Sequence, residues 1–200
     1  MPIKSPDLHG SVPDASAVAL LLIDVINDLE FEGGETLLVQ ALPAAERIAA
    51  LKGRARAAGV PVVYVNDNFG RWRSDFRTLV RHCLDDDVRG RPIARLLAPD
   101  DDDYFVLKPK HSGFLSTALD LLLAHLETRM LVLTGLTAES CVLFTANDAY
   151  MRDFHLLVPS DCVASNDPAD CGRALDHMAR VLKADTRPSN ALDLDALKRR

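Results

Sequence analysis

The stretch Met130-Leu131-Val132-Leu133-Thr134 is an apolar run, and the turn Gly135-Leu136-Thr137-Ala138-Glu139-Ser140 connects it directly to Cys141. A short, continuous apolar run is typical of a strand that is covered on both faces of a sheet. Cys141 begins a segment that we interpret as a helix extending to Asp153. The stretch therefore predicts a buried strand, a tight turn and a helix, which is the repeating unit of a parallel sheet.

The same alternation of strand and helix continues in both directions along the chain. We predict strands at 17–24, 61–66, 104–108, 130–135, 155–159 and, in short form, 184–186, separated by helical segments at 35–58, 71–84, 91–97, 115–126, 141–153 and 170–183. Such alternation requires right-handed crossovers and places helices on both faces of the sheet. The sequence therefore predicts a three-layer α/β/α, Rossmann-like fold with a six-stranded, mostly parallel sheet. We expect a single domain over 1–200, in which 1–16 form an N-terminal surface segment.

Composition excludes several classes of function. The chain of 200 residues has a formal net charge of −6 and scattered basic residues, so it lacks the basic stripe that binds nucleic acid. Its longest strongly apolar stretch, 17–23, is far shorter than the roughly 20 residues of a membrane span. The N-terminus lacks the order of a signal peptide, and the four cysteines form no CxxC pair. These features predict a cytoplasmic protein that binds neither nucleic acid nor membrane.

Three chemically active side chains follow predicted strands. Asp24 ends the run Leu20-Leu21-Leu22-Ile23, Lys108 ends Tyr104-Phe105-Val106-Leu107, and Cys141 follows the fourth strand and its turn. The carboxyl ends of parallel strands meet at the edge where α/β proteins bind ligands. A cysteine at a helix start is exposed to backbone amides that favour the thiolate. Each residue alone has an ordinary structural explanation, but together they predict an activated cysteine nucleophile.

These segments resemble the isochorismatase-like cysteine hydrolases. The resemblance rests on Leu22–Asp28, Lys108–Phe114, and Gly135–Val142 together with Thr145–Ala149. It implies the catalytic triad Asp24, Lys108 and Cys141 on a sheet of strand order 3-2-1-4-5-6. It also implies a cis peptide between Leu136 and Thr137, an oxyanion hole formed by the backbone N–H groups of Thr137 and Cys141, and a dimer or tetramer.

The implied reaction is acyl transfer. Asp24 accepts the thiol proton while Lys108 stabilises the thiolate and keeps Asp24 ionised. Cys141 attacks a carbonyl carbon, Asp24 returns the proton to a leaving amine, and water then hydrolyses the thioester with Asp24 as the base.

Two departures from the family pattern narrow the function. Ile26 stands where a glutamine is frequent, and the segment 66–73, after the second strand, contains none of the histidines with which the nicotinamidase branch binds a metal. Asp67 without imidazole partners is a poor transition-metal site. We therefore expect no metal and no cofactor. We assign His111, His155 and His177 to structural roles.

The segment after the second strand is the predicted specificity loop, because loops beyond the strand ends shape a pocket. Trp72 either forms a wall of the site or packs in the core of a crossover helix. The candidate substrate-binding residues are Asn27, Phe31, Asn68, Phe69, Trp72 and Arg73. The leading hypothesis is a metal-independent hydrolase that cleaves the C–N bond of a small amide, carbamoyl or ureido compound. The alternatives are hydrolysis of an isochorismate-like vinyl ether and a non-catalytic or redox thiol protein.

Overall fold

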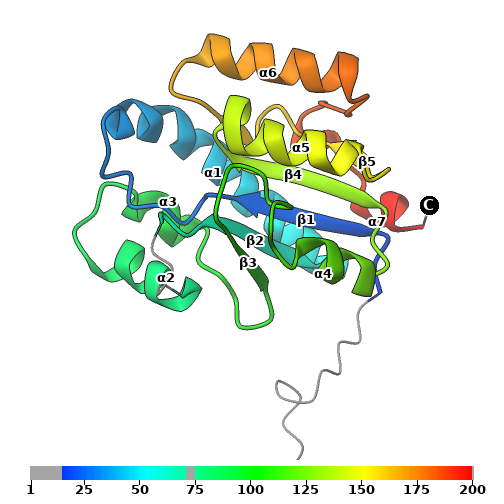
Figure 1. Ribbon diagram of the computed structural model, residues 1–200, viewed down its shortest axis with the longest axis horizontal. Helices are drawn as coiled ribbons and strands as arrows, with labels where there is room; N and C mark the ends of the chain where they lie inside the picture. Colours follow the sequence, from blue (N-terminus) through cyan, green and yellow to red (C-terminus); the bar gives the residue numbers. More distant parts are fainter. Residues whose placement is uncertain (1–14, 71–74, 200) are drawn as a thin grey trace, which may run out of the picture.

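The computed structural model describes residues 15–70 and 75–199, and Figure 1 shows its ribbon. Within these residues, six strands form one sheet: β1 (Val18–Ile23), β2 (Val62–Asp67), β3 (Tyr104–Lys108), β4 (Met130–Leu136), β5 (His155–Leu157) and β6 (Val163–Ala164). Every strand pairing is parallel. The order is β3-β2-β1-β4-β5, and β6 also pairs with β4. The fold is therefore the predicted α/β/α arrangement.

The sixth strand differs from the one predicted at 184–186. There the structure has a single parallel bridge, between Leu157 and Asp185, on the outer side of β5. The strand that extends the sheet is β6, which pairs with Gly135 and Leu136 at the carboxyl end of β4. β5 ends two residues before Pro159, which has no N–H for a ladder. The chain then returns to β4 beyond that end.

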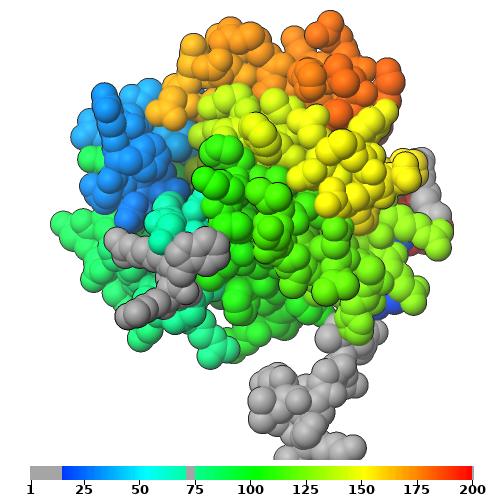
Figure 2. All heavy atoms as spheres, in the orientation of Figure 1, coloured from blue at the N-terminus to red at the C-terminus, as the bar shows by residue number. Residues whose placement is uncertain are grey.

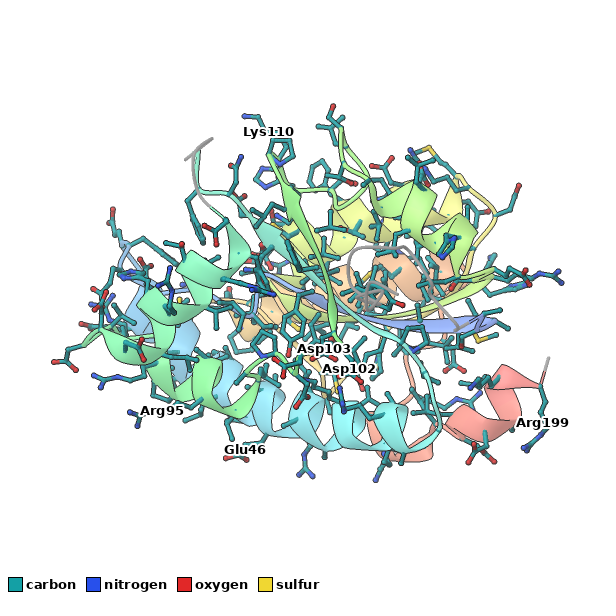
Figure 3. The ribbon with its side chains drawn as sticks, turned by 90° about the horizontal axis from the view of Figure 1, so that it is seen from below. Glu46, Arg95, Asp102, Asp103, Lys110 and Arg199 are labelled. Atoms are coloured by element: carbon teal, nitrogen blue, oxygen red, sulfur yellow. The ribbon has the colours of Figure 1, made fainter. Side chains whose placement is uncertain are left out.

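Helices cover both faces of the sheet, as Figures 1 and 3 show. One face packs against α1 (Gly34–Ala57), α2 (Phe76–Asp85), α3 (Arg91–Leu96) and α7 (Leu194–Lys198), and the 3-10 turn η3 (Ser189–Ala191) contacts α1. The other packs against α4 (Leu119–His125), α5 (Leu143–Tyr150) and α6 (Pro168–Val181). Along β1, Leu20 and Leu22 belong to the first core, whereas Leu21 and Ile23 belong to the second. This alternation explains the continuous apolar strands, because both faces of β1 are buried.

The carboxyl end of β4 lies against β1 because Gly135 has no side chain. Its φ is +116°, and a Cβ at this position would lie 2.0 Å from the carbonyl oxygen of Ile23. That close approach brings the turn after β4 to the residue that follows Ile23, which is Asp24.

The helix predicted to begin at Cys141 begins earlier. A π-helical turn, η2 (Ala138–Val142), precedes α5, and Cys141 is its fourth residue. α5 ends at Tyr150 rather than Asp153. Figure 2 shows α5 and α6 side by side on the surface of the molecule.

In the described parts of the chain, no helix combines the length and apolar character that a membrane crossing requires.

Candidate active site

Asp24, Lys108 and Cys141 meet at the carboxyl edge of the sheet. Lys108 Nζ lies 2.7 Å from Asp24 Oδ2 and 3.4 Å from Cys141 Sγ. Lys108 is fully buried and Asp24 is 6% exposed, whereas Cys141 is half-buried. The ammonium group therefore contacts both other members of the predicted triad.

Asp24 is held by the backbone as well as by the lysine. Its backbone N–H donates to the carbonyl of Val65, at 3.0 Å, and its Oδ1 accepts a hydrogen bond from Asp67 N, at 2.6 Å. Its φ of 51° is left-handed, a conformation that turns the chain sharply at the end of β1. Each carboxylate oxygen thus has a partner from another strand, Oδ1 from β2 and Oδ2 from β3.

Burial and charge set the protonation states of the three groups. Burial raises the pKa of Asp24, and the nearby Lys108 ammonium opposes the shift. Burial lowers the pKa of Lys108, but Asp24, Cys141 and Asp67 together raise it above its usual value. Burial, followed by the charge of Asp24, raises the pKa of the Cys141 thiol to about 12 even though Lys108 opposes this. The resting nucleophile is therefore a thiol beside a carboxylate of increased basicity.

The structure thus differs from the expectation that a helix start favours the Cys141 thiolate. Cys141 lies inside η2, two residues before α5 begins, and the desolvation of its thiol outweighs the charge of Lys108. Ser140 also lies inside η2, which has Thr137 at its cap position and no side-chain cap bond. Nucleophile formation then requires proton transfer to Asp24.

The turn after β4 is anchored at several points. The peptide bond between Leu136 and Thr137 is cis, and the Thr137 carbonyl accepts hydrogen bonds from the N–H groups of Ser140 and Val142, both at 3.2 Å. Thr145 Oγ1 donates to the carbonyl of Cys141, at 2.7 Å. These contacts fix Cys141 relative to the strand end.

The predicted substrate residues have different positions. Asn68 donates its backbone N–H to the carbonyl of Lys108, at 3.0 Å, so it adjoins the triad. The Asn27 side chain accepts from Leu29 N, at 2.8 Å, and forms a local turn. Phe31 and Phe69 are each 45% exposed. Trp72 and Arg73 lie outside the described residues.

Two further residues contact the triad. Asp67 Oδ2 lies 3.6 Å from Lys108 Nζ. His111 Nδ1 lies 3.8 Å from Cys141 Sγ and 3.4 Å from Ser140 Oγ. Sequence reasoning assigned His111 a structural role, yet it adjoins the nucleophile. The available signal was its place three residues after Lys108, at the same edge of the sheet.

The described residues offer few side chains that could bind a metal ion together. Among residues 15–70 and 75–199, no group of three or more His, Cys, Asp or Glu side chains is arranged to hold a metal ion. Asp67 Oδ1 accepts a hydrogen bond from Phe69 N, at 2.6 Å, and its other oxygen faces the Lys108 ammonium.

Comparison with known proteins identifies the family of this chain. Residues 18–186 match the sequence family described as the isochorismatase domain. The isochorismatase family protein YaaI of Bacillus subtilis is 44% identical over 84% of this chain and 91% of its own length. The ureidoacrylate amidohydrolase RutB of Methylorubrum extorquens is 30% identical over 78% of this chain and 73% of its own. The crystal structure of N-carbamoylsarcosine amidase from Thermoplasma acidophilum superposes with a TM-score of 0.65 and 28% identity, over 88% of this chain and 98% of that one. The chain therefore belongs to the isochorismatase family of hydrolases.

Proposed function

We propose that this protein is a metal-independent cysteine hydrolase that cleaves the C–N bond of a small amide, carbamoyl or ureido compound through a thioester. The observation that carries the proposal is the position of Lys108 Nζ, within 2.7 Å of Asp24 and 3.4 Å of Cys141. This arrangement pairs a nucleophile with a proton acceptor and gives both a common cation.

In the first step, Asp24 accepts the thiol proton as Sγ bonds to the substrate carbonyl carbon. The raised pKa of Asp24 makes its carboxylate a stronger base, which reduces the mismatch with a thiol whose pKa is about 12. Lys108 stays cationic, because the negative groups around it raise its pKa, and it stabilises the negative charge as it develops on sulfur. Lys108 thus lowers the energy of a thiolate that forms only as the attack occurs.

The carbonyl oxygen becomes an oxyanion when sulfur adds. We assign its stabilisation to the backbone N–H groups of Thr137 and Cys141, at the two ends of the turn that follows the cis peptide. Collapse of this intermediate releases the amine and leaves a thioester on Cys141, which water then hydrolyses to the acid.

The relatives support the substrate class. Ureidoacrylate amidohydrolase and N-carbamoylsarcosine amidase are named for substrates that contain a carbonyl carbon bonded to nitrogen. The donor set supports the metal-independent mechanism, because Asp67 faces an ammonium group that would repel a cation. A small molecule is therefore the proposed binding partner. We also expect a homo-oligomer, which light scattering would detect as a molar mass above that of one chain.

The test is a turnover screen of the purified protein against small amides, carbamates and ureas, with ammonia or amine release as the readout. We expect Cys141→Ala to lose turnover, whereas Cys171→Ala, which removes another half-buried thiol, retains it. Full turnover by Cys141→Ala would overturn the thioester route. Cleavage of isochorismate by that variant would instead support vinyl-ether hydrolysis. Failure of the whole panel would favour a non-catalytic thiol protein, and stoichiometric metal with activity lost on chelation would overturn the metal-independent mechanism.

A further inference from the structure

His111 lies on the solvent side of the nucleophile. Its Nδ1 is 3.8 Å from Cys141 Sγ, and the residue is exposed. Lys108 and Asp24 approach the same thiol from the buried side. The sulfur atom thus has two acid–base groups, Lys108 and Asp24, on its buried side and a third, His111, on its exposed side.

The His111 ring is held in place although it is exposed. Ser112 donates a short hydrogen bond to Asp148, and Gly113 N donates to Thr145 Oγ1, at 3.0 Å, so the loop after β3 is bound to α5. The ring packs against Phe144 with centroids 5.3 Å apart. Thr145 Oγ1 also donates to the carbonyl of Cys141. One residue of α5 therefore fixes both the histidine loop and the cysteine.

Asp24 is poorly placed for proton transfers on the open side of the sulfur. Its Oδ1 accepts from Asp67 N and its Oδ2 from Lys108, and only 6% of the residue is exposed. His111 is exposed and its Nδ1 lies 3.8 Å from Sγ, so it is the acid–base group on the open side of the sulfur. A group at this position can exchange protons with a leaving nitrogen and a water that approach from solvent, because proton transfer requires hydrogen-bond distance.

We propose that His111 is a second proton-transfer residue, which protonates the leaving nitrogen and then activates the hydrolytic water. This inference rests on the proposed thioester function and assigns to His111 the two later proton transfers that the sequence resemblance assigned to Asp24. His111 Nδ1 contacts Sγ, one of the reacting atoms. The second ring nitrogen, Nε2, lies across the ring from that contact.

The proton balance closes over one turnover. Asp24 takes the thiol proton as the S–C bond forms, and His111, starting as imidazolium, gives its proton to nitrogen as the C–N bond breaks. A water molecule then adds to the thioester carbon and gives one proton to neutral His111, which restores the imidazolium. The S–C bond breaks, and the thiolate recovers its proton from Asp24. The products are one carboxylic acid and one amine.

Charged groups surround this histidine on several elements. Lys108 of β3 lies beyond the sulfur, and Asp24 and Asp67 lie next to that lysine. Asp148 of α5 is bound to the neighbouring Ser112. Lys110 of the same loop points away from the protein in Figure 3.

The experiment uses 4-nitrophenyl acetate, whose phenolate leaves without a proton. Rapid nitrophenolate release measures acetylation of Cys141, intact mass shows the acetyl-enzyme, and steady-state release measures deacetylation. We expect His111→Gln to change acetylation less than about 3-fold but to slow deacetylation by roughly 10²-fold or more, the usual effect of losing a general base. His125→Gln, an exposed histidine at the end of α4, is the matched control and should match wild type.

The other outcomes overturn different statements. Equal slowing of both steps by His111→Gln would show that the histidine positions Cys141 rather than transferring protons. An unchanged deacetylation rate would leave Asp24 as the base for water. If wild type neither releases nitrophenolate nor gains an acetyl group, or if Cys141→Ala still gains one, the thioester function itself is wrong.

Discussion

Replacement of Lys108 by methionine tests the electrostatic arrangement of the site. Methionine retains the apolar stem but removes an ammonium that is fully buried and 2.7 Å from Asp24. The carboxylate left behind is 6% exposed, so water cannot replace the lost partner. Removing one member of a buried ion pair costs about 3–5 kcal/mol, because the other charge stays uncompensated. Asp67, which is 3.6 Å from the ammonium and 29% exposed at its side chain, adds little to this cost.

Urea unfolding measures the effect. With a dependence of about 2 kcal/mol per molar urea, the unfolding midpoint of Lys108→Met should fall by about 2 M relative to wild type. A total stability of about 5–15 kcal/mol leaves the variant folded in most of that range. Addition of Asp24→Asn should recover most of the loss, because the amide is neutral and its oxygen can still accept from Asp67 N.

The penalty also depends on pH. Burial raises the pKa of Asp24 in the folded protein, and the loss of Lys108 raises it further, because that ammonium opposes the shift. The folded variant therefore binds a proton that the unfolded chain releases near pH 3.8, so its stability falls as pH rises above that value. The difference from wild type should be small near pH 4 and larger at pH 7. A loss below about 1 kcal/mol at pH 7, or no recovery with Asp24→Asn, would refute the paired-charge description of the site.

Two further predictions concern stability. Gly135→Ala should lower the free energy of unfolding in urea by about 3 kcal/mol or more, because its Cβ would lie 2.0 Å from the Ile23 carbonyl oxygen. The control Gly53→Ala has open space around it in α1 and should raise the free energy of unfolding by about 0.5–1 kcal/mol. Similar effects of the two changes would contradict the close approach of β4 and β1. Hydrogen bonds to Asp86 and a second carboxylate raise the pKa of His82 above 6.5, so its small stabilising contribution should be present below that pH and disappear as pH rises through the folded pKa. A wild-type minus His82→Gln difference that grows with pH would contradict this.

Local sequence patterns predicted most of the fold. The apolar run of β4 and the alternation of strands with helices are local features, and they predicted the parallel sheet. The order β3-β2-β1-β4-β5 agrees with the order that the family resemblance implied. The short elements were less predictable. β6 has only two residues, and the bridge at Asp185 one, so neither carries enough alternation to register in the sequence.

The candidate site was predictable where it depends on strand ends. Asp24, Lys108 and the cysteine segment each follow an apolar strand, and parallel strands bring such ends together. His111 was not recognised, because its contact with Cys141 depends on how the loop after β3 is bound to α5.

The sequence by itself determined which side chains meet, since parallel topology places every strand end at one edge of the sheet. Only the tertiary structure decided how those side chains behave. Desolvation and a carboxylate neighbour keep the Cys141 thiol protonated, although its neighbouring lysine favours the thiolate. Desolvation and ångström-scale distances between charges arise from packing among segments far apart in the chain, and no local pattern encodes them.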